Sequence, residues 1–292
     1  VHSHVDVYNF SAKNWTERFE TPKEMAHSHL GVASDGIRYI YIVSGQHGTQ
    51  CTAPPVALSF VLDTKTRTWE TFPSLPAPRY APATQIWKGR LHVMGGSKEN
   101  RHTPATDHWS IALKNGKEWR NEIPIPRGGP HRACVAVDDK LFVIGGQEGD
   151  FMPKPGSPIF KCSRRHEVVY PDVYMLDDTR MKWKVLAPMP KPNSHIESSW
   201  ILLNNSSIII MGGTTEKHPL TKRMILVGEI FQFHLDTMQW SVIGKLPYRV
   251  KTTLAGFWDG WLYFTSGQRD RGPDNPQPKK VIGEMWRTKL SF

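Results

Sequence analysis

The sequence predicts an all-β protein built from a repeated unit. Five copies of one apolar phrase, each ending at a glycine, recur along the 292 residues. Proline and glycine, 23 of each, interrupt the chain so often that no long stretch carries apolar residues at the spacing of a helical face. Short strands joined by turns are the structure that remains.

The clearest copy of the phrase is HRACVAVDDKLFVIGG at residues 131–146. Two apolar runs flank the turn residues Asp138 and Asp139, and the second run stops at a glycine pair, so the stretch predicts a hairpin of two buried strands. The other copies are LHVMGG at 91–96, IIIMGG at 208–213, YIYIVSGQ at 39–46 and LYFTSGQ at 262–268. Their recurrence defines the repeat.

Each copy is followed by a polar loop, an aromatic strand, a tryptophan strand and a proline-rich link. The aromatic strands carry Tyr8, Phe60, Trp109, Tyr174, Phe231 and Trp286, and a carboxylate precedes five of these six rings by two residues. The tryptophan strands carry Trp15, Trp69, Trp119, Trp183 and Trp240, at separations of 54, 50, 64 and 57 residues. We assign these residues a structural role, because glycine lets a neighbouring backbone come close and large rings fill the space between twisted sheets.

A unit of about 50 residues with one glycine pair and one tryptophan resembles the blade of a kelch β-propeller, along the whole chain. The resemblance implies a single kelch-type β-propeller over residues 1–292, and the six aromatic strands predict six blades. The first blade is expected to be incomplete at the N-terminus, with only its outer strands in residues 1–25. Four full blades are expected in 26–249. The last blade, in 250–292, would lack its outermost strand, which places three missing strands upstream of Val1 and open strand edges around residues 1–19.

Residues 80–101, 123–151 and 245–274 resemble more narrowly a plant group of galactose oxidase/kelch superfamily proteins. In that group an N-terminal membrane anchor can precede the propeller, so the resemblance implies a Golgi or other secretory-pathway lumen, with a cytoplasmic location as the alternative. No apolar run in the chain approaches the ~18–20 residues of a membrane span, and membrane attachment is expected only through an anchor upstream of the chain. Four Asn-x-Ser/Thr sequons, at Asn9, Asn14, Asn204 and Asn205, are compatible with a secretory compartment.

The formal net charge of +10 favours an anionic partner if the basic residues gather on one surface. Cys51, Cys134 and Cys162 form no CxxC pair, so no zinc cluster is indicated. Cys134 lies in an apolar strand and is expected in the core, whereas Cys51 and Cys162 lie in predicted loops, as free thiols or as a pair. His27 and His29 alternate along an innermost strand, but two imidazoles without a third ligand nearby predict no metal site. We expect no cofactor.

Candidate binding residues come from two sets of connections that emerge on the same face of a propeller. The first set is the long loops after the glycine strands, at residues 97–106, 147–171, 214–227 and 268–282. The second is the proline-rich links LPAPRY, IPIPRGGPHR, MPKPNSH and LPYRVK, which bring basic or imidazole side chains to the mouth of the central channel. Together they give the predicted site: Arg79, Arg127, His131, Arg132, Arg164, Arg165, His195, Arg249, Lys251, Arg269 and Arg271.

The leading hypothesis is a non-catalytic binding protein whose basic loop face recognises an anionic partner, either an acidic glycan or an acidic protein segment. The chain contains no P-loop, HExxH, GxSxG or CxxC motif, and no catalytic residue is assigned. One alternative is a carbohydrate-active enzyme of the plant secretory pathway, with Glu148, Asp150 and Glu197 as candidate acid and base. Another is a substrate adaptor of a ubiquitin ligase, as other kelch propellers are, although these residues include no BTB or F-box segment. Nucleic acid is not an expected partner, because the basic residues lie in dissimilar loops without an aromatic stacking platform.

Overall fold

The computed structural model describes residues 2–48, 53–149, 151–152, 163–164, 167–179, 181–270 and 280–290. The elements assigned within these residues are all β-strands, as the sequence predicts. No helix that could span a membrane occurs among them. The chain divides into two compact units. Unit 1 comprises Val1–Pro130 with Glu148–Glu167, and unit 2 comprises His131–Gln147 with Val168–Phe292.

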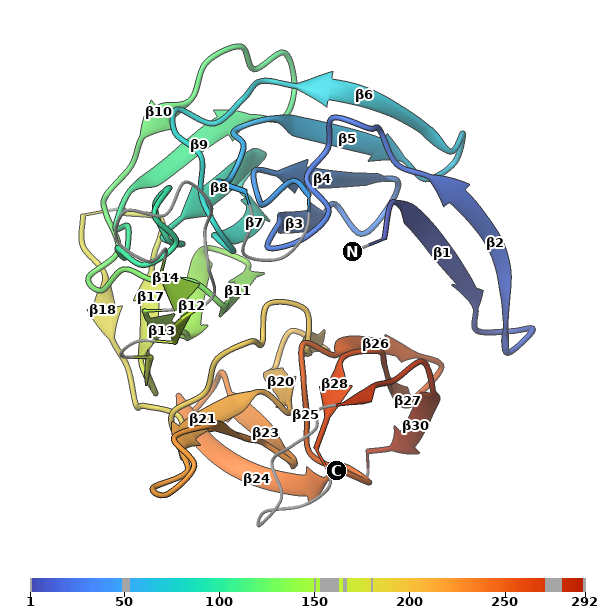
Figure 1. The fold of residues 1–292 in the computed structure, drawn as a ribbon, viewed down its shortest axis with the longest axis vertical. Coiled ribbons are helices and arrows are strands. Elements are labelled where there is room, and N and C mark those ends of the chain that lie inside the picture. The colour runs from blue at the N-terminus through green and yellow to red at the C-terminus, as the bar shows by residue number, and fades with distance from the viewer. Residues whose placement is uncertain are drawn as a thin grey trace. The chain divides into compact units, whose positions relative to one another are not determined.

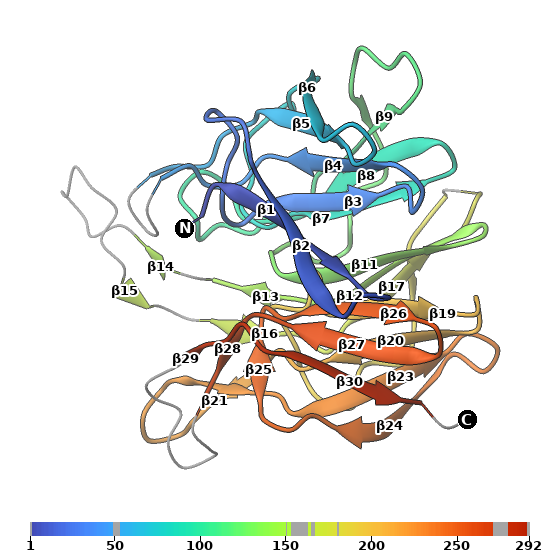
Figure 2. The same ribbon diagram turned by 90° about the vertical axis from the view of Figure 1, so that its right-hand side faces the viewer.

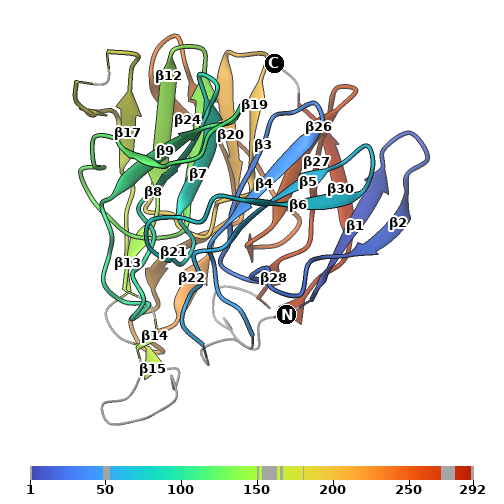
Figure 3. The same ribbon diagram turned by 90° about the horizontal axis from the view of Figure 1, so that it is seen from above.

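The described residues of unit 1 form a hairpin, two four-stranded antiparallel sheets and a short strand pair. The four-stranded sheets have the orders β3-β4-β5-β6 and β10-β9-β8-β7 (Figure 1), and β1 and β2 form a separate hairpin (Figure 3). The strands are β1 (His4–Asn9), β2 (Asn14–Glu20), β3 (Gly31–Ser34), β4 (Tyr39–Val43), β5 (Ser59–Asp63), β6 (Thr68–Phe72), β7 (Ala83–Trp87), β8 (Arg90–Met94), β9 (His108–Ala112), β10 (Arg120–Asn121), β14 (Phe151–Met152) and β15 (Ser163–Arg164).

The described residues of unit 2 form two four-stranded sheets, β11-β12-β17-β18 and β19-β20-β23-β24, and a three-stranded sheet, β26-β27-β30. Two small sheets, β21-β22 and β25-β28-β29, continue from them, and Figure 2 shows β21, β25, β28 and β29 at one end of β20, β27 and β30. The strands are β11 (Arg132–Val137), β12 (Lys140–Gly145), β17 (Val173–Leu176), β18 (Lys184–Val185), β19 (Trp200–Leu203), β20 (Ser207–Met211), β21 (Thr214–Lys217), β22 (Met224–Leu226), β23 (Glu229–His234), β24 (Gln239–Lys245), β25 (Val250–Lys251), β26 (Leu254–Trp258), β27 (Trp261–Thr265), β28 (Gln268–Arg269), β29 (Lys280–Val281) and β30 (Met285–Lys289). The remaining short strands are β13 (Gln147–Glu148) and β16 (Val168–Val169).

The sheets follow the repeat that the sequence indicates. Each glycine phrase ends the second strand of a larger sheet, and each aromatic ring of those sheets lies on the third strand. The four four-stranded sheets, the three-stranded sheet β26-β27-β30 and the β1–β2 hairpin, all among the described residues, are consistent with the expected blades. The continuous apolar runs occur where a strand is buried on both faces. In unit 2, β20 is buried along its whole length, whereas the outer strand β18 is exposed.

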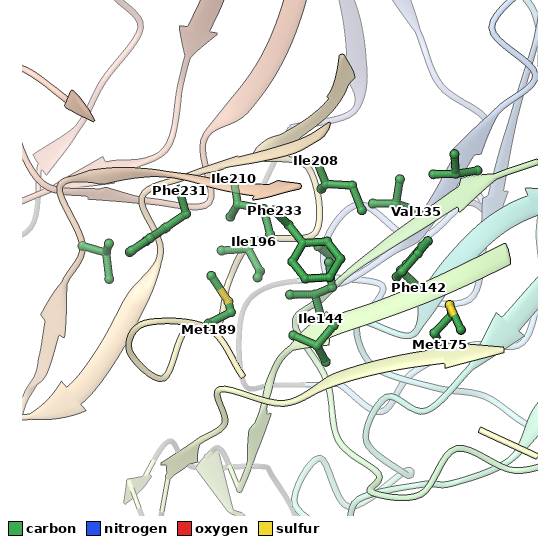
Figure 4. Close-up of a cluster of buried hydrophobic side chains, with 14 residues drawn as sticks. Val135, Phe142, Ile144, Met175, Met189, Ile196, Ile208, Ile210, Phe231 and Phe233 are labelled. Atoms are coloured by element: carbon green, nitrogen blue, oxygen red, sulfur yellow. The ribbon is translucent and has the colours of Figure 1, made fainter. Parts of the chain in front are cut away.

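A buried cluster joins two of the sheets of unit 2. Phe142 and Ile144 of β12 pack in one cluster with Ile208 and Ile210 of β20 and Phe233 of β23 (Figure 4), and all five side chains are excluded from solvent. The ring centroids of Phe142 and Phe233 lie 6.0 Å apart in an edge-to-face arrangement. Burial of these residues is the main reason that the two sheets stay together.

The glycine pairs join each sheet to the link that leads into the next one. In unit 2 the amide of Gly213 donates a hydrogen bond to the carbonyl of Val250 at 2.8 Å, and in unit 1 the amide of Gly96 donates to Gly129 at 3.1 Å. Gly212, before Gly213, has φ +65°, and a Cβ built there would lie 2.4 Å from the Val250 carbonyl oxygen. The close backbone approach that the glycine pairs predict is therefore confirmed.

The repeated tryptophans make a second joint. The indole Nε1 of Trp69 donates to the carbonyl of Glu20 at 3.2 Å, that of Trp119 to Pro73 at 3.0 Å and that of Trp240 to Ala187 at 3.0 Å. Each acceptor lies at or just after the fourth strand of the preceding repeat. The ring fills the space between two sheets while its polar edge satisfies a backbone carbonyl.

Candidate functional site

Two basic residues of the links are paired with carboxylates that precede the aromatic rings. The Nη2 atom of Arg79 lies 2.6 Å from Oδ2 of Asp107, the Arg79 side chain is 5% exposed, and its guanidinium lies 4.9 Å from the centroid of the Trp109 ring. The Nζ atom of Lys191 lies 2.5 Å from Oε1 of Glu229. Burial acts to raise the pKa of Glu229, but the hydrogen bond and charge of Lys191 hold that pKa below its usual value. The basic residues of the links and the carboxylates before the aromatic rings, which the sequence presents as separate features, are thus partners.

Arg132 and Arg249 are also engaged within unit 2. Arg132 is 1% exposed and its guanidinium lies 5.7 Å from the centroid of the Tyr170 ring. Arg249 pairs with Asp270, with 2.7 Å between Nη2 and Oδ2, and the Asp270 side chain is buried. Replacement of Arg132 or Arg249 by glutamate would therefore disturb the fold as well as the binding of any ligand.

His131 and His195, predicted from different links, lie face to face. Their ring centroids are 3.9 Å apart with an interplanar angle of 15°. The Nδ1 atom of His131 is hydrogen-bonded to Oε1 of Glu197, and Nδ1 of His195 lies 3.0 Å from the Ser194 hydroxyl oxygen and 3.2 Å from that of Thr214. The carboxylate of Glu197, which the sequence offered as an acid or base, serves here to orient an imidazole.

The two histidines occupy a backbone position that recurs before the innermost strands. The residues at this position all have a left-handed φ, between 43° and 66°: His29, Ala81, His131, His195 and Thr252. Two pairs of consecutive members are bonded through the backbone, with Ala81 N donating to His29 O at 2.7 Å and Thr252 N to His195 O at 3.2 Å. Sequence reasoning missed this position because no glycine marks it.

Sequence reasoning also did not single out Arg101. It lies in the loop after β8, is 3% exposed and has φ 61°. Its Nη1 donates to Oε1 of Gln46 at 3.0 Å, its Nη2 lies 3.1 Å from Nε2 of His29, and its guanidinium lies 5.4 Å from the centroid of the Tyr80 ring. The burial of one arginine within a polar loop has no signal in a single sequence.

The remaining predicted site residues are placed as follows. Lys251 lies in β25, and Arg269 lies in β28 with its guanidinium 4.3 Å from the centroid of the Tyr248 ring. Arg127 is exposed in unit 1. Arg164 ends β15, which pairs with β14. Arg165, Arg271, Asp150, Cys51 and Cys162 lie outside the described residues. Cys134 is buried, as expected, and burial raises the pKa of its thiol.

Charge is segregated between the two ends of unit 2. We call the end where the glycine strands β12, β20 and β27 stop the loop end, and the opposite end the hairpin end (Figure 2, Figure 3). Among the described residues the loop end has ten basic and six acidic side chains, whereas the hairpin end has four basic and six acidic ones; Arg287, in the middle of β30, belongs to neither end. The basic residues at the loop end are Arg132, Lys191, Lys217, Lys222, Arg223, Lys245, Arg249, Lys251, Arg269 and Lys280, and the acidic ones are Asp172, Glu197, Glu216, Glu229, Asp270 and Glu284. The hairpin end has Lys140, Lys182, Lys184 and Lys289 with Asp138, Asp139, Asp177, Asp178, Asp236 and Asp259.

The β21–β22 hairpin presents an exposed turn at the loop end. Its turn is closed by hydrogen bonds from His218 N to Arg223 O at 2.7 Å and from Lys222 N to His218 O at 2.9 Å. The Nδ1 atom of His218 accepts hydrogen bonds from the amides of Leu220 and Thr221. Leu220 is 85% exposed, and Lys222 and Arg223 are exposed beside it. The turn therefore holds an apolar side chain and two cations in solvent.

The predicted site coincides neither with a cluster of metal ligands nor with the apolar pocket beside β24, in the part of the chain that the structure describes. No group of three or more histidine, cysteine, aspartate or glutamate side chains is arranged there to hold a metal ion. His27 lies in ring contact with His47 at 5.5 Å between centroids, and burial together with the nearby His47 lowers the pKa of His27. An apolar pocket of about 390 Å³ lies between β24 and β30, and none of the predicted site residues lines it.

The repeated sheets, joined at glycine pairs and tryptophans, define a repeat-built β-propeller protein. The KLHDC2/KLHL20/DRC7 Kelch-repeats domain matches residues 1–213. The Kelch repeat-containing protein At3g27220 of Arabidopsis thaliana is 72% identical over 295 residues, which cover 100% of this chain and 68% of that protein. The chain belongs to the kelch-repeat family.

Two further comparisons extend this result. The human Kelch repeat and BTB domain-containing protein 13 is 32% identical over 136 residues, 44% of this chain and 27% of that protein. A solved kelch propeller, described as "Structure of YjhT", has a TM-score of 0.70 at 18% identity over 94% of this chain and 84% of that one, which shows the fold alone. The all-β, kelch-type propeller fold that the sequence predicts is confirmed. Kelch domains generally mediate protein interactions.

Proposed function

We propose that the chain is a non-catalytic binding module whose loop end in unit 2 recognises an acidic segment of another protein. The observation that carries the proposal is the segregation of charge within unit 2, where the excess of basic residues lies at the loop end alone. Long-range attraction steers an acidic partner toward such a surface and repels a basic one. The general role of kelch domains in protein interactions favours a protein partner over a glycan.

The β21–β22 hairpin is the proposed centre of contact. Leu220 offers an apolar anchor, and Lys222 and Arg223 offer charges that a carboxylate-rich segment can pair with. Because the backbone of the turn is already fixed by hydrogen bonds, little conformational entropy is lost when a partner binds. Lys251 and Arg269 on β25 and β28 extend the surface within the same unit.

Some residues predicted from the sequence are left out of the proposed surface. Arg79 and Arg132 are buried in contact with side chains of their own unit, and Arg249 is held by Asp270. Their charges still add to the local electrostatic potential, but their side chains are held by residues of their own unit and are not positioned to bind a partner. The proposed surface therefore depends on the exposed residues of the small sheets.

The test uses a fluorescein-labelled polyglutamate peptide as probe and the full-length protein. Lys222→Glu with Arg223→Glu should weaken binding at low salt by at least about tenfold, equivalent to about 1.4 kcal/mol. Lys140→Glu with Lys182→Glu makes the same change of charge at the hairpin end and should leave binding within about twofold. Thermal unfolding of each variant checks that the fold is kept.

Two outcomes would oppose the proposal. If both double variants lose affinity equally, only the net charge matters and the loop end has no special role. If labelled polygalacturonate binds more tightly than polyglutamate and depends on the same two residues, the partner is an acidic glycan instead.

A further inference from the structure

All four sequons of the chain fall in just two β-hairpins. Four of the nine asparagines are followed by the pattern x-Ser/Thr, and they occupy the β1–β2 hairpin in unit 1 and the β19–β20 hairpin in unit 2. The five other asparagines are outside such a pattern. We propose that each hairpin carries one N-linked glycan, and that the chain therefore passes through a lumen where this transfer takes place.

The β1–β2 hairpin exposes both of its acceptors. Asn9 and Asn14 face each other across the two strands at the closed end, and both are exposed. The Oδ1 atom of Asn9 accepts a hydrogen bond from the amide of Ala12 at 2.9 Å, which leaves the attachment atom, Nδ2, outside that bond. Because two glycans on directly opposed residues would collide, one glycan is expected at this hairpin.

The β19–β20 hairpin exposes its acceptors at the tip. Asn204 and Asn205 have φ 50° and 51° and are exposed, as is Ser206, the hydroxyl residue of the first sequon. Ser207, the hydroxyl residue of the second, is buried and accepts a hydrogen bond from Gln232. Asparagine tolerates the left-handed conformation of this turn, so the turn and the sequon make compatible demands on the same residues.

Both hairpins lie away from the loops, each within its own unit. The turn between β19 and β20 is at the opposite end of β20 from Gly212 and Gly213. The turn between β1 and β2 is at the opposite end of β2 from the link whose His27 amide bonds to the Gln46 carbonyl. A glycan at Asn204 or Asn205 would cover the hairpin end of unit 2 and leave the loop end of the same unit uncovered.

Aromatic rings beside the first sequons, with Trp15 the exposed one of the three, give a glycan a surface to lie on. The Tyr8 ring contacts Phe10 at 5.4 Å and Trp15 at 5.2 Å between centroids, and Trp15 is 47% exposed. The apolar face of the first sugar can pack on such a ring and shield it from water.

The modification is a group transfer. The Nδ2 atom of asparagine forms a bond to C1 of the sugar and loses a proton. The bond between C1 and the diphosphate oxygen of a lipid-linked oligosaccharide breaks, and the lipid diphosphate leaves.

The full-length protein expressed in plant leaf cells provides the test. Treatment of the extract with a peptide N-glycosidase should increase gel mobility by two steps. Ser11→Ala with Thr16→Ala should remove one step, and Asn205→Asp with Ser206→Ala should remove the other, while both pairs keep the local turn geometry. Asn121→Gln, at an exposed asparagine outside any sequon, is the matched control and should remove none.

Mass spectrometry of the released peptides decides the result directly. Conversion of one asparagine to aspartate per hairpin, after enzymatic release in heavy-oxygen water, is the expected result. Unmodified asparagine at positions 9, 14, 204 and 205 in the leaf-expressed protein would overturn the proposal. A mobility step that survives all four hydroxyl and asparagine replacements would assign the glycan elsewhere and equally contradict it.

Discussion

Gly212 has a left-handed backbone conformation directly against the link to the next sheet of unit 2. A side chain at this position meets two separate obstacles, the backbone strain of φ +65° and the carbonyl oxygen of Val250 at 2.4 Å from the new Cβ. Backbone cannot swing aside as the tip of a flexible side chain can, so the close contact is expected to displace the link.

Replacement of Gly212 by alanine should therefore lower the free energy of unfolding by more than about 3 kcal/mol. Gly260→Ala is the matched control, because Gly260 has φ +76° with no atom within 4 Å of a new Cβ. It should cost only the strain of the left-handed conformation, about 1 kcal/mol. Urea unfolding of both variants measures the difference, and equal losses would show that the joint does not depend on close approach.

The ion pair of Lys191 and Glu229 is expected to stabilise the native state at neutral pH. A double-mutant cycle with Lys191→Met and Glu229→Gln should give a coupling of about 1 kcal/mol at pH 7. The fold lowers the pKa of Glu229, so the contribution is complete above the carboxyl group's unfolded pKa of about 4.3 and is lost as pH falls through the lower, folded pKa. Urea titrations at pH 7 and below pH 4.3 measure this. A coupling that grows on acidification would contradict the assignment.

Residue partners were the least predictable part of the site. The sequence placed basic side chains in the links, but not the carboxylates that pair with them, 28 residues further on for Arg79 and 38 for Lys191. A regular sign was present, since a carboxylate precedes most of the aromatic rings by two residues. The sequence does not show that these carboxylates pair with the basic residues of the links. That pairing follows from the strand order, which puts the third strand of each sheet beside the link.

At the scale of elements, the tryptophan joint makes a separate prediction. Trp240→Phe keeps an aromatic ring between two sheets of unit 2 but removes the hydrogen bond to the Ala187 carbonyl. The free energy of unfolding should fall by about 1 kcal/mol, because a partly buried acceptor is left without its donor. Trp15→Phe, at a half-exposed indole, should change it by less than about 0.5 kcal/mol. Urea unfolding of both variants measures the two changes in free energy. Equal changes at positions 240 and 15 would show that the indole hydrogen bond does not stabilise the joint.

Long strands were predictable and short ones were not. The second strands, such as β12 and β20, are runs of branched and aromatic residues ended by glycine, which is a strong local signal. Residues 214–227 were expected only as a loop, yet they contain β21 and β22. Their sequence is polar and mixed, and the pairing arises because backbone groups beside the buried sheet need partners.

On the scale of the whole chain, repetition made the fold class accessible from sequence. A motif that returns five times is far less ambiguous than any one copy, and the match of residues 1–213 to kelch repeats confirms the interpretation. The segregation of charge was not accessible in the same way. It depends on which end of a strand each charged residue occupies and on which cations are already paired, as Lys191 and Arg249 are.

Lysine footprinting can show where on unit 2 an acidic protein segment binds. Full-length protein is acetylated briefly with and without the polyglutamate peptide, and the modification of each lysine is read by mass spectrometry. If the loop end binds the peptide, Lys217, Lys222, Lys251 and Lys280 should be protected, while Lys182 and Lys184 at the hairpin end react as before. Protection of the hairpin-end lysines, or equal reactivity at both ends with the peptide bound, would contradict it.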